Sequence, residues 1–588
     1  MNFISRFALL ILFVLSSVGF TVAQEVTPSP SPSPDVPGDR LVVPPVAPEF
    51  RGEQKPLPEL GRVGVDMNQQ HPMSLKEAIA LALENNKDIE VARDNVKIAE
   101  FDLNGARGAY DPRFNTTAFY ERIKSPISSF LSGGQNGSTI QSDYTGSAKL
   151  EGLAPHGGNY KLEFSSIRLT TNNQFVALNP QFPSALTFTF TQPLMRGFKI
   201  DNSRRQIEIA KKNLSLSDAQ FRQRAIDTIT NVQRAYWDLV FALRNLQIQR
   251  DTVRDARTQL EHNKRMVNEG QLAPIDVVAA QAQITTFEQA VFSALEDVSR
   301  TENNLKNLIA ANRNSSLWTE SLVPTDPVEL SAPDVVLPDA LKTAMENRPE
   351  LTQSEVLREM NQIDQKFLKD QTRPAIDLVG SYGISGLAGS VSTAGVNPFT
   401  ASSLQVRQRV DELSVLEGLD PLPVVPPQTF SPNLLGGYGQ SIQNLVENRY
   451  NNFRVGVQIN LPLRNRTAEA QLGRSQVEGQ RIATQREQLE QNIQVDVRNA
   501  LQTMRSAEAR LRAAIATREA SEQQFASEQR RLDAGQSTVF LVLERQNALT
   551  TARGNELRAQ TDLNKAVAEL QRATGNALSV NSIVVRVR

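Results

Sequence analysis

The residues that most often carry out catalysis or bind metals are scarce in this sequence and lie far apart. The chain has no cysteine, so thiol nucleophiles, thiolate ligands and disulfides are excluded. Its three histidines, His71, His156 and His262, have no partner at a spacing typical of a metal or catalytic site. The stretch GISGLAG (383–389) lacks the G-x-G-x-x-G register and the following helix of a phosphate-binding loop. We therefore expect neither an enzymatic activity nor a cofactor.

Composition and the N-terminal region indicate export from the cytoplasm. The 63 basic and 64 acidic residues give a net charge of −1, which excludes the basic footprint of a nucleic-acid-binding protein. Residues 1–23 contain one early Arg, an apolar stretch and small residues before Gln24, a pattern that predicts a signal peptide rather than a transmembrane anchor. The proline-rich region that follows favours extended chain, so we assign residues 24–72 to a linker.

The rest of the chain consists of two similar halves. Residues 75–89 (LKEAIALALENNKDI) align without gaps with residues 337–351 (LPDALKTAMENRPEL). LTFTFTQPL at 186–194 corresponds in the same way to VGVQINLPL at 455–463. We therefore predict a tandem duplication. Its two repeats span 73–328 and 329–575, and a tail follows at 576–588.

A third repeated stretch predicts a turn between two long helices. Residues 265–271 read RMVNEGQ and residues 530–536 read RRLDAGQ, so Arg-x-x-x-x-Gly-Gln recurs 265 residues apart. Residues before and after the first of these glycines repeat every seven positions and are apolar, which predicts coiled-coil packing of two helices. The heptad positions before Gly270 are Ala225, Val232, Leu239, Leu246, Val253, Leu260 and Val267. A helix from Ser203 to Asn268 would be ~100 Å long at 1.5 Å per residue.

Four segments have the two-residue period of a β-strand. Leu186, Phe188 and Phe190 alternate with threonines, and 453–460 alternates in the same manner. Partner strands are expected near 113–122 and 375–384. Such alternation fits a sheet on a soluble core as well as a sheet in a membrane. The intervening regions 124–182 and 385–450 are rich in Gly, Ser, Asn and Pro and predict long loops, with room for extra hairpins.

These features together resemble the TolC-like outer membrane efflux proteins. The resemblance covers roughly residues 73–575 and rests on the duplicated order, on NRPEL (347–351), on AYWDLVFA (235–242) and on the two repeated turns. It implies a mainly α-helical fold with a membrane β-barrel, in which tandem long coiled-coil hairpins form an α-helical barrel. Four strands per chain would contribute to a twelve-stranded barrel in a homotrimer. This agrees with the requirement that strands in lipid leave no open edge.

The resemblance also implies a function, a location and partners. It predicts the outer membrane channel of a tripartite efflux or type I secretion system, in the outer membrane of a Gram-negative-type bacterium and extending into the periplasm. Outer membrane lipid would surround it. A periplasmic adaptor protein and an inner-membrane transporter of RND, ABC or MFS type would be its partners. Two alternatives are a periplasm-spanning coiled coil or adhesin without a lumen, and a periplasmic adaptor, which usually has a single hairpin and extra β-domains.

Finally, the resemblance assigns roles to residues near the two turns. The turns would form the periplasmic tips that dock the adaptor. The tip residues are Arg265, Gly270, Asp276, Arg530 and Gly535. The acidic residues Asp276 and Glu544 match positions that narrow the tunnel mouth in family members. Leu541, Leu532 and Ser537 depart from the family, because some members have an acidic residue, a Tyr and an Arg there.

Overall fold

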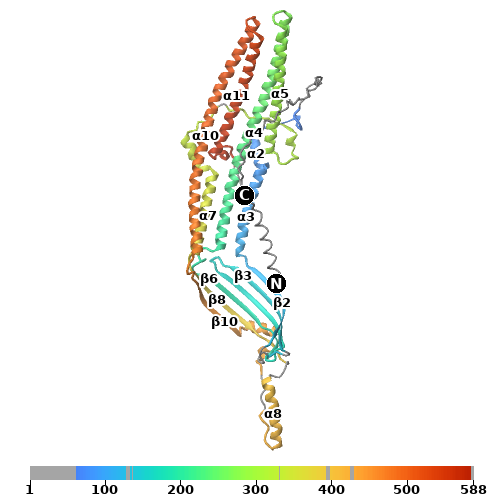
Figure 1. The fold of residues 1–588 in the computed structure, drawn as a ribbon, viewed down its shortest axis with the longest axis vertical. Coiled ribbons are helices and arrows are strands. Elements are labelled where there is room, and N and C mark those ends of the chain that lie inside the picture. The colour runs from blue at the N-terminus through green and yellow to red at the C-terminus, as the bar shows by residue number, and fades with distance from the viewer. Residues whose placement is uncertain are drawn as a thin grey trace, which may run out of the picture. The chain divides into compact units, whose positions relative to one another are not determined.

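A computed structural model describes most of the chain after residue 60. The described residues are 61–127, 133–134, 137–329, 331–392, 398–423 and 429–583. The predicted signal peptide, the linker up to residue 60 and the last five residues of the tail lie outside them. Within the described part, long helices gather at one end and a twisted sheet lies at the other (Figure 1).

The helices occur in the same order in both halves of the chain. Each half has two consecutive helices, then the sheet strands, then a helical hairpin. The first half contains α2 (Leu75–Asn85), α3 (Lys87–Arg107), α4 (Asn202–Asn268) and α5 (Pro274–Ile309). The second contains α6 (Leu337–Asn347), α7 (Pro349–Gln371), α10 (Arg466–Asp533) and α11 (Val539–Ala573). The region that contains the strands therefore lies at the same place in both halves, between α3 and α4 in the first and between α7 and α10 in the second.

The heptad pattern predicted the long helix α4 correctly. This helix has 67 residues and differs from the predicted one by a single residue at its start. Of the predicted heptad positions, all those from Ala225 to Leu260 are buried. On the returning helix α5, Ile284, Val298 and Leu305 are buried against them. The seven-residue spacing therefore marks the seam along which the hairpin packs.

One residue in each half breaks the leading helix pair and caps the hairpin. Asn86 separates α2 from α3, and its amide donates to the carbonyl of Leu308 at 3.1 Å, near the end of α5. Arg348 separates α6 from α7 and donates to the carbonyl of Ala573 at 3.2 Å, at the end of α11. Carbonyls at a helix C-terminus have no partner within the helix. In both halves, the residue between the two leading helices supplies the missing donor.

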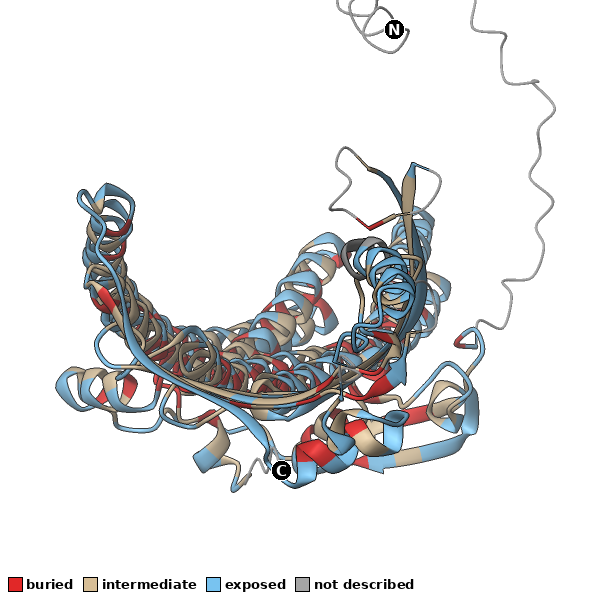
Figure 2. Ribbon diagram, turned by 90° about the horizontal axis from the view of Figure 1, so that it is seen from below, coloured by how far each residue is buried: buried red, intermediate tan, exposed pale blue. Residues whose placement is uncertain are grey.

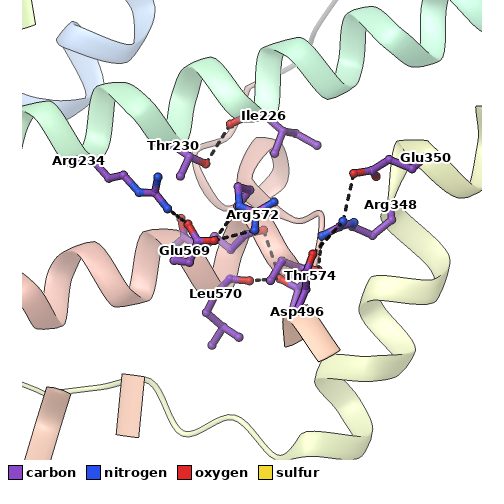
Figure 3. A network of polar contacts seen from close by, with 12 residues as sticks. Ile226, Thr230, Arg234, Arg348, Glu350, Asp496, Glu569, Leu570, Arg572 and Thr574 are labelled. Atoms are coloured by element: carbon purple, nitrogen blue, oxygen red, sulfur yellow. Dashed lines mark hydrogen bonds and ion pairs between the residues drawn. The ribbon is translucent and has the colours of Figure 1, made fainter. Parts of the chain in front are cut away.

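Charged side chains join the two halves beside these caps (Figure 3). Glu569 on α11 accepts hydrogen bonds from Arg572, at 2.6 Å, and from Arg234 on α4. Arg348 is 7 % exposed and pairs with Glu350 at 3.1 Å and with Asp496 on α10 at 3.4 Å. Although partial burial raises the pKa of Glu569, the two arginines outweigh it and hold that pKa below its usual value. The carboxylate thus bridges helices of both repeats.

Six long strands of the described residues form one antiparallel sheet in the order β10-β8-β6-β4-β3-β2. The short strands β5 (Leu178–Gln181) and β9 (Gly389–Val391) pair at its margin. The long strands are β2 (Arg113–Pro126), β3 (Ser138–Leu153), β4 (Asn159–Thr171), β6 (Ser184–Pro193), β8 (Ala375–Gly386) and β10 (Tyr450–Asn460). The four predicted strands correspond to β2, β6, β8 and β10.

The number of strands differs from the sequence-based expectation. The described residues form six long strands instead of four, because β3 and β4 form a hairpin within 124–182, the predicted loop region with room for extra hairpins. The other predicted loop, 385–450, contains β9, α8 (Pro398–Leu416), a 3₁₀ turn at Pro432–Leu434 and α9 (Tyr438–Val446). The physical reason is composition, because Gly and Ser occupy many positions of β3 and are more typical of loops than of strands.

The boundary of the predicted linker also differs from the structure. Asp66–Met73 form β1, which pairs in parallel with β7 (Glu320–Pro324) and therefore belongs to the folded unit. Arg62 lies just before this strand, and its guanidinium contacts Glu302 on α5 at 2.8 Å. At the other end of the chain, the predicted tail begins with the short helix α12 (Ala577–Val580).

Candidate functional site

Both repeated Arg-x-x-x-x-Gly-Gln stretches form the same turn at the end of a long helix. Gly270 has φ +74° and Gly535 has φ +70°. The amide of Gln271 donates to the carbonyl of Met266, and that of Gln536 donates to the carbonyl of Arg531, each at 2.8 Å. With the matching bonds made by the two glycine amides, this is the Schellman arrangement, which requires a left-handed residue after the helix.

Asp276 has a structural role at the first turn. Its carboxylate accepts a hydrogen bond from the amide of Ala273 at 3.2 Å and so caps the start of α5. In the second turn, Thr538 corresponds to Ala273, and its hydroxyl accepts from the amide of Leu541 at 3.4 Å. The capping oxygen therefore comes from different positions in the two turns. This explains how Leu541 can replace an acidic residue without leaving α11 uncapped.

The other predicted site residues are exposed near the turns. Glu544 lies exposed on α11 and forms no ion pair among the described residues. Arg265 and Arg530 are exposed near the ends of α4 and α10, and their carbonyls accept from the residues just before the turn glycines. These positions leave the side chains available for a partner. Adaptor docking and constriction of a mouth by these residues stay predictions.

Polar side chains connect the two hairpins close to the turns, which the sequence had not indicated. The Nε2 atom of His262 on α4 lies 3.1 Å from the Oδ1 atom of Asp533 at the end of α10. Gln529 donates to Gln259 at 3.2 Å, one helical turn further from the tip. A cavity of about 220 Å³ lies between the hairpins, lined among others by Thr252 and Gln546. The contact between the hairpins therefore includes polar groups, unlike the apolar seam within each hairpin.

An apolar cluster complements these polar contacts at the tips. Leu272, from the first turn, packs against buried Leu532, Val539 and Val542 of the second hairpin. Leu532 is 1 % exposed, so this position near the end of α10 belongs to the core of the tip.

A pair of alanine substitutions tests the turn geometry. A Cβ atom added at Gly535 or at Gly554 would meet no atom within 4 Å, so neither substitution causes a clash. Gly535→Ala is expected to destabilise the tip by about 1–2 kcal/mol, because only Gly adopts positive φ without cost. Gly554→Ala, inside α11, is expected to stabilise the protein by up to about 1 kcal/mol. Hydrogen exchange at residues 530–540 should quicken in the first variant only, and equal rates in both would contradict this assignment.

The sheet has one apolar and one polar face. Cross-strand partners preserve the division, since Leu150 pairs with Leu162, Leu162 with Phe188, and Phe188 with Tyr382. Many apolar residues of this face are exposed, including Phe114, Tyr120, Tyr144, Leu378, Phe453, Val455, Val457 and Ile459. The opposite face carries residues such as Arg113, Asn115, Lys149, Glu163, Thr189, Asp377 and Arg454. An exposed apolar sheet face of this extent indicates contact with lipid or another apolar surface.

Both outer strands of the sheet have an unpaired edge. Every residue of β2 and of β10 is exposed. Among the described residues, β2 pairs only with β3, and β10 pairs only with β8. Viewed along its length, the described unit forms an open arc (Figure 2). Long exposed edges favour pairing with another chain.

The remaining candidate residues are not assembled into a catalytic or metal site. His71 lies 3.0 Å from Glu320, whereas His156 occupies the turn between β3 and β4. GISGLAG runs through the end of β8 into β9, so it is strand and not a phosphate loop. In the described part of the chain, no group of three or more His, Cys, Asp or Glu residues is placed to hold a metal ion. The helices described there include none that is long and apolar enough to cross a membrane.

Known proteins share this architecture. A membrane protein from Pseudomonas aeruginosa is similar to the chain with a TM-score of 0.58 and 16 % identity, over 87 % of this chain and 91 % of that one. The Campylobacter jejuni CmeC outer membrane channel has a TM-score of 0.57 and 13 % identity, over 86 % of each chain. The Neisseria gonorrhoeae MtrE outer membrane channel has a TM-score of 0.54 and 18 % identity, over 86 % of this chain and 89 % of that one. No curated protein matches by sequence. The sequence profile of the outer membrane efflux proteins matches residues 178–311 and 429–576, which include both helical hairpins and their turns. Both hairpin regions therefore match the family of outer membrane efflux proteins, and the chain shares the fold of the TolC-like outer membrane channels CmeC and MtrE.

Proposed function

We propose that the protein is the outer membrane channel of a tripartite efflux or type I secretion system. The observation that carries the proposal is a sheet with one exposed apolar face and one polar face, joined directly to two long helical hairpins. The apolar face would contact outer membrane lipid and the polar face would line water. The hairpins would extend this conduit through the periplasm. Such a conduit needs no catalytic group, because energy enters at the inner-membrane transporter.

The free strand edges support a closed oligomer, for which we propose a homotrimer. Lipid does not tolerate open sheet edges, so β2 of one copy must pair with β10 of the next. Successive strands alternate in direction from β2 to β10, and their even number makes these two edge strands antiparallel to each other. A ring of identical copies can therefore close with antiparallel pairing at every joint.

The two turns of each copy would form the periplasmic tips. There the exposed Arg265 and Arg530 are available to an adaptor protein, which would link the channel to an RND, ABC or MFS transporter. Asp276 and Glu544 would place two acidic groups per copy close to the mouth. Like charges held together attract cations, and salt screens this attraction.

Planar-bilayer recording of the purified protein tests the function. We expect a stable trimer by native mass spectrometry and single-channel currents. Co-expressed adaptor and transporter should co-purify with it. A coiled coil or adhesin without a lumen would give no current, and a periplasmic adaptor would not fractionate with the outer membrane. Either result would overturn the proposal.

Removal of the charge on Glu544 tests the position of the mouth. Glu544→Gln should lower the ratio of cation to anion permeability by about twofold or more at low salt, and the difference should shrink at 1 M salt, where the screening length is about 3 Å. Glu469→Gln is the control, because Glu469 is an exposed acid in the first turn of α10, far from the tips. Equal selectivity of the two variants and the wild type at low salt would show that Glu544 does not face the permeating ions.

A further inference from the structure

We propose that β3 and β4 are an inserted hairpin that forms part of the channel wall. Each copy then contributes six strands, and three copies close a wall of eighteen strands. The inference rests on the proposed channel function. It concerns the width and the lining of the pore. The four strands per chain predicted from the sequence would give a barrel of only twelve strands.

The duplication identifies which strands are extra. In the second half, β8 pairs directly with β10, from Ala375 opposite Asn460 to Ser385 opposite Tyr450. The corresponding strands of the first half, β2 and β6, do not pair, because β3 and β4 lie between them. A hairpin inserts two antiparallel strands, so β2 and β6 keep their relative direction.

The inserted strands have the same two faces as the rest of the sheet. On the apolar face, Tyr144 pairs with Tyr120, and Phe164 pairs with Leu186. On the polar face, Ser147 lies between Thr117 and Ser165. The division of faces continues across β3 and β4 in the half of the sheet nearest the helices. Towards the loops it is mixed, because Arg168 lies opposite Tyr144 on the apolar face, and Phe119 and Ile167 flank Thr145 on the polar face. A hairpin that lay free at the cell surface would not need lipid-facing residues in register with those of β2 and β6.

The turn of the hairpin lies at the helical end of the sheet. Gly158 accepts a hydrogen bond from the Ala154 amide at 2.7 Å, and the carbonyl of His156 accepts one from Gln192 at 3.0 Å. A Cβ on Gly157 would lie 2.6 Å from the carbonyl oxygen of Gly197, just before α4. Both strands therefore run the full height of the sheet, from the loops to the junction with the helices.

The insertion changes both the width and the lining of the pore. Barrel diameter grows roughly linearly with strand number, so eighteen strands give a wall about one and a half times as wide as twelve. The polar face of the hairpin adds two ion pairs per copy, Lys149 with Glu151 and Lys161 with Glu163. The barrel lumen would thus carry a belt of charges of both signs close to the helical junction, suited to bulky hydrated solutes.

Thiol labelling tests whether the hairpin lies in the wall, since the native chain has no cysteine. In proteoliposomes, Ser147→Cys on the polar face should react with a charged, membrane-impermeant maleimide. Ala148→Cys on the apolar face should react at least tenfold more slowly with it, but readily with a lipid-soluble maleimide. Thr189→Cys and Phe188→Cys on β6 are the matched controls, because β6 belongs to the wall in either arrangement. Equal, rapid labelling of Ser147→Cys and Ala148→Cys beside a normal contrast on β6 would overturn the inference.

The number of copies in the oligomer and the pairing of β10 of one copy with β2 of the next provide the second readout. Cysteines on β10 at Val455 and on β2 at Phe114, Ala118 or Tyr120 should form a disulfide between copies in at least one combination, giving linked species up to a trimer. Electron microscopy should resolve eighteen strands. Twelve strands, or a dimer by native mass, would refute the insertion into a trimeric wall even if the protein conducts ions. Absence of conductance and of oligomers would instead refute the proposed function.

Discussion

Val455→Arg is expected to remove most of the assembled channel from the outer membrane. Val455 lies at the middle of β10, is 59 % exposed and belongs to the apolar face of the sheet. An arginine facing lipid near the bilayer midplane costs about 2–4 kcal/mol, and the cost recurs in every copy of a trimer. The readout is the amount of heat-modifiable oligomer in outer membrane fractions, compared with the wild type.

The neighbouring residues provide a control for this substitution. Arg454 occupies the opposite face in the native chain, so an arginine is already tolerated one position away. Gln458→Arg, on the same polar face, should therefore assemble normally. The double variant Arg454→Val with Val455→Arg keeps composition and net charge but should fail like the single variant. If it assembles as well as Gln458→Arg, the apolar face does not contact lipid.

The helices and turns were predictable because their signals are local and repeated. Seven-residue spacing over α4 determines which side packs, and a Gly after a long helix predicts the left-handed turn that Gly270 and Gly535 adopt. The strands β6 and β10 were predictable for a similar reason. In β6 an aromatic or branched residue alternates with threonine, so period two is evident from the sequence.

The strands β3 and β4 were harder to predict because small and polar residues occupy many positions on their apolar face. On β3 that face includes Ser142, Gly146 and Gly152 beside Tyr144 and Leu150. A lipid-facing strand needs only moderate apolarity, so its alternation is much weaker than the signal of a buried strand or a membrane helix. Only the register with β2 and β6 shows that these residues share one face.

The two turns were predictable in location, whereas the contacts around them were not. The turns lie where the repeated motif predicted, but the motif did not predict that Asp276 caps α5. The pairs Gln259–Gln529 and His262–Asp533 join residues about 270 positions apart. Such contacts depend on how two hairpins lie side by side, and the heptad pattern within each hairpin carries no information about it.

The other large effect is expected at a buried ionic cluster that holds the N-terminal strand against the first hairpin. Glu302 on α5 contacts Arg62 at 2.8 Å and Lys306 at 3.4 Å, and its carboxylate also accepts from the amide of Leu322 on β7. All three charged side chains are at most 6 % exposed. Glu302→Gln would leave two buried cations without their anion. We expect a loss of about 3–5 kcal/mol, the usual cost of removing one partner of a buried pair.

The pH dependence of this loss distinguishes the cluster from simple packing. Burial lowers the pKa of Lys306 below its ordinary 10.5, and Glu302 acts against this shift. Glu302→Gln should lower that pKa further, so the folded variant releases a proton that the unfolded chain still binds. Because the unfolded state then binds more protons, stability rises with pH between the lowered pKa and 10.5, so the defect is larger at neutral pH than near pH 10. Thermal unfolding followed by helical circular dichroism measures both effects. Glu296→Gln, at an exposed position on the same helix, should stay within about 0.5 kcal/mol of the wild type at every pH. A Glu302→Gln protein that is as stable as this control would show that Arg62 and Lys306 do not depend on the carboxylate.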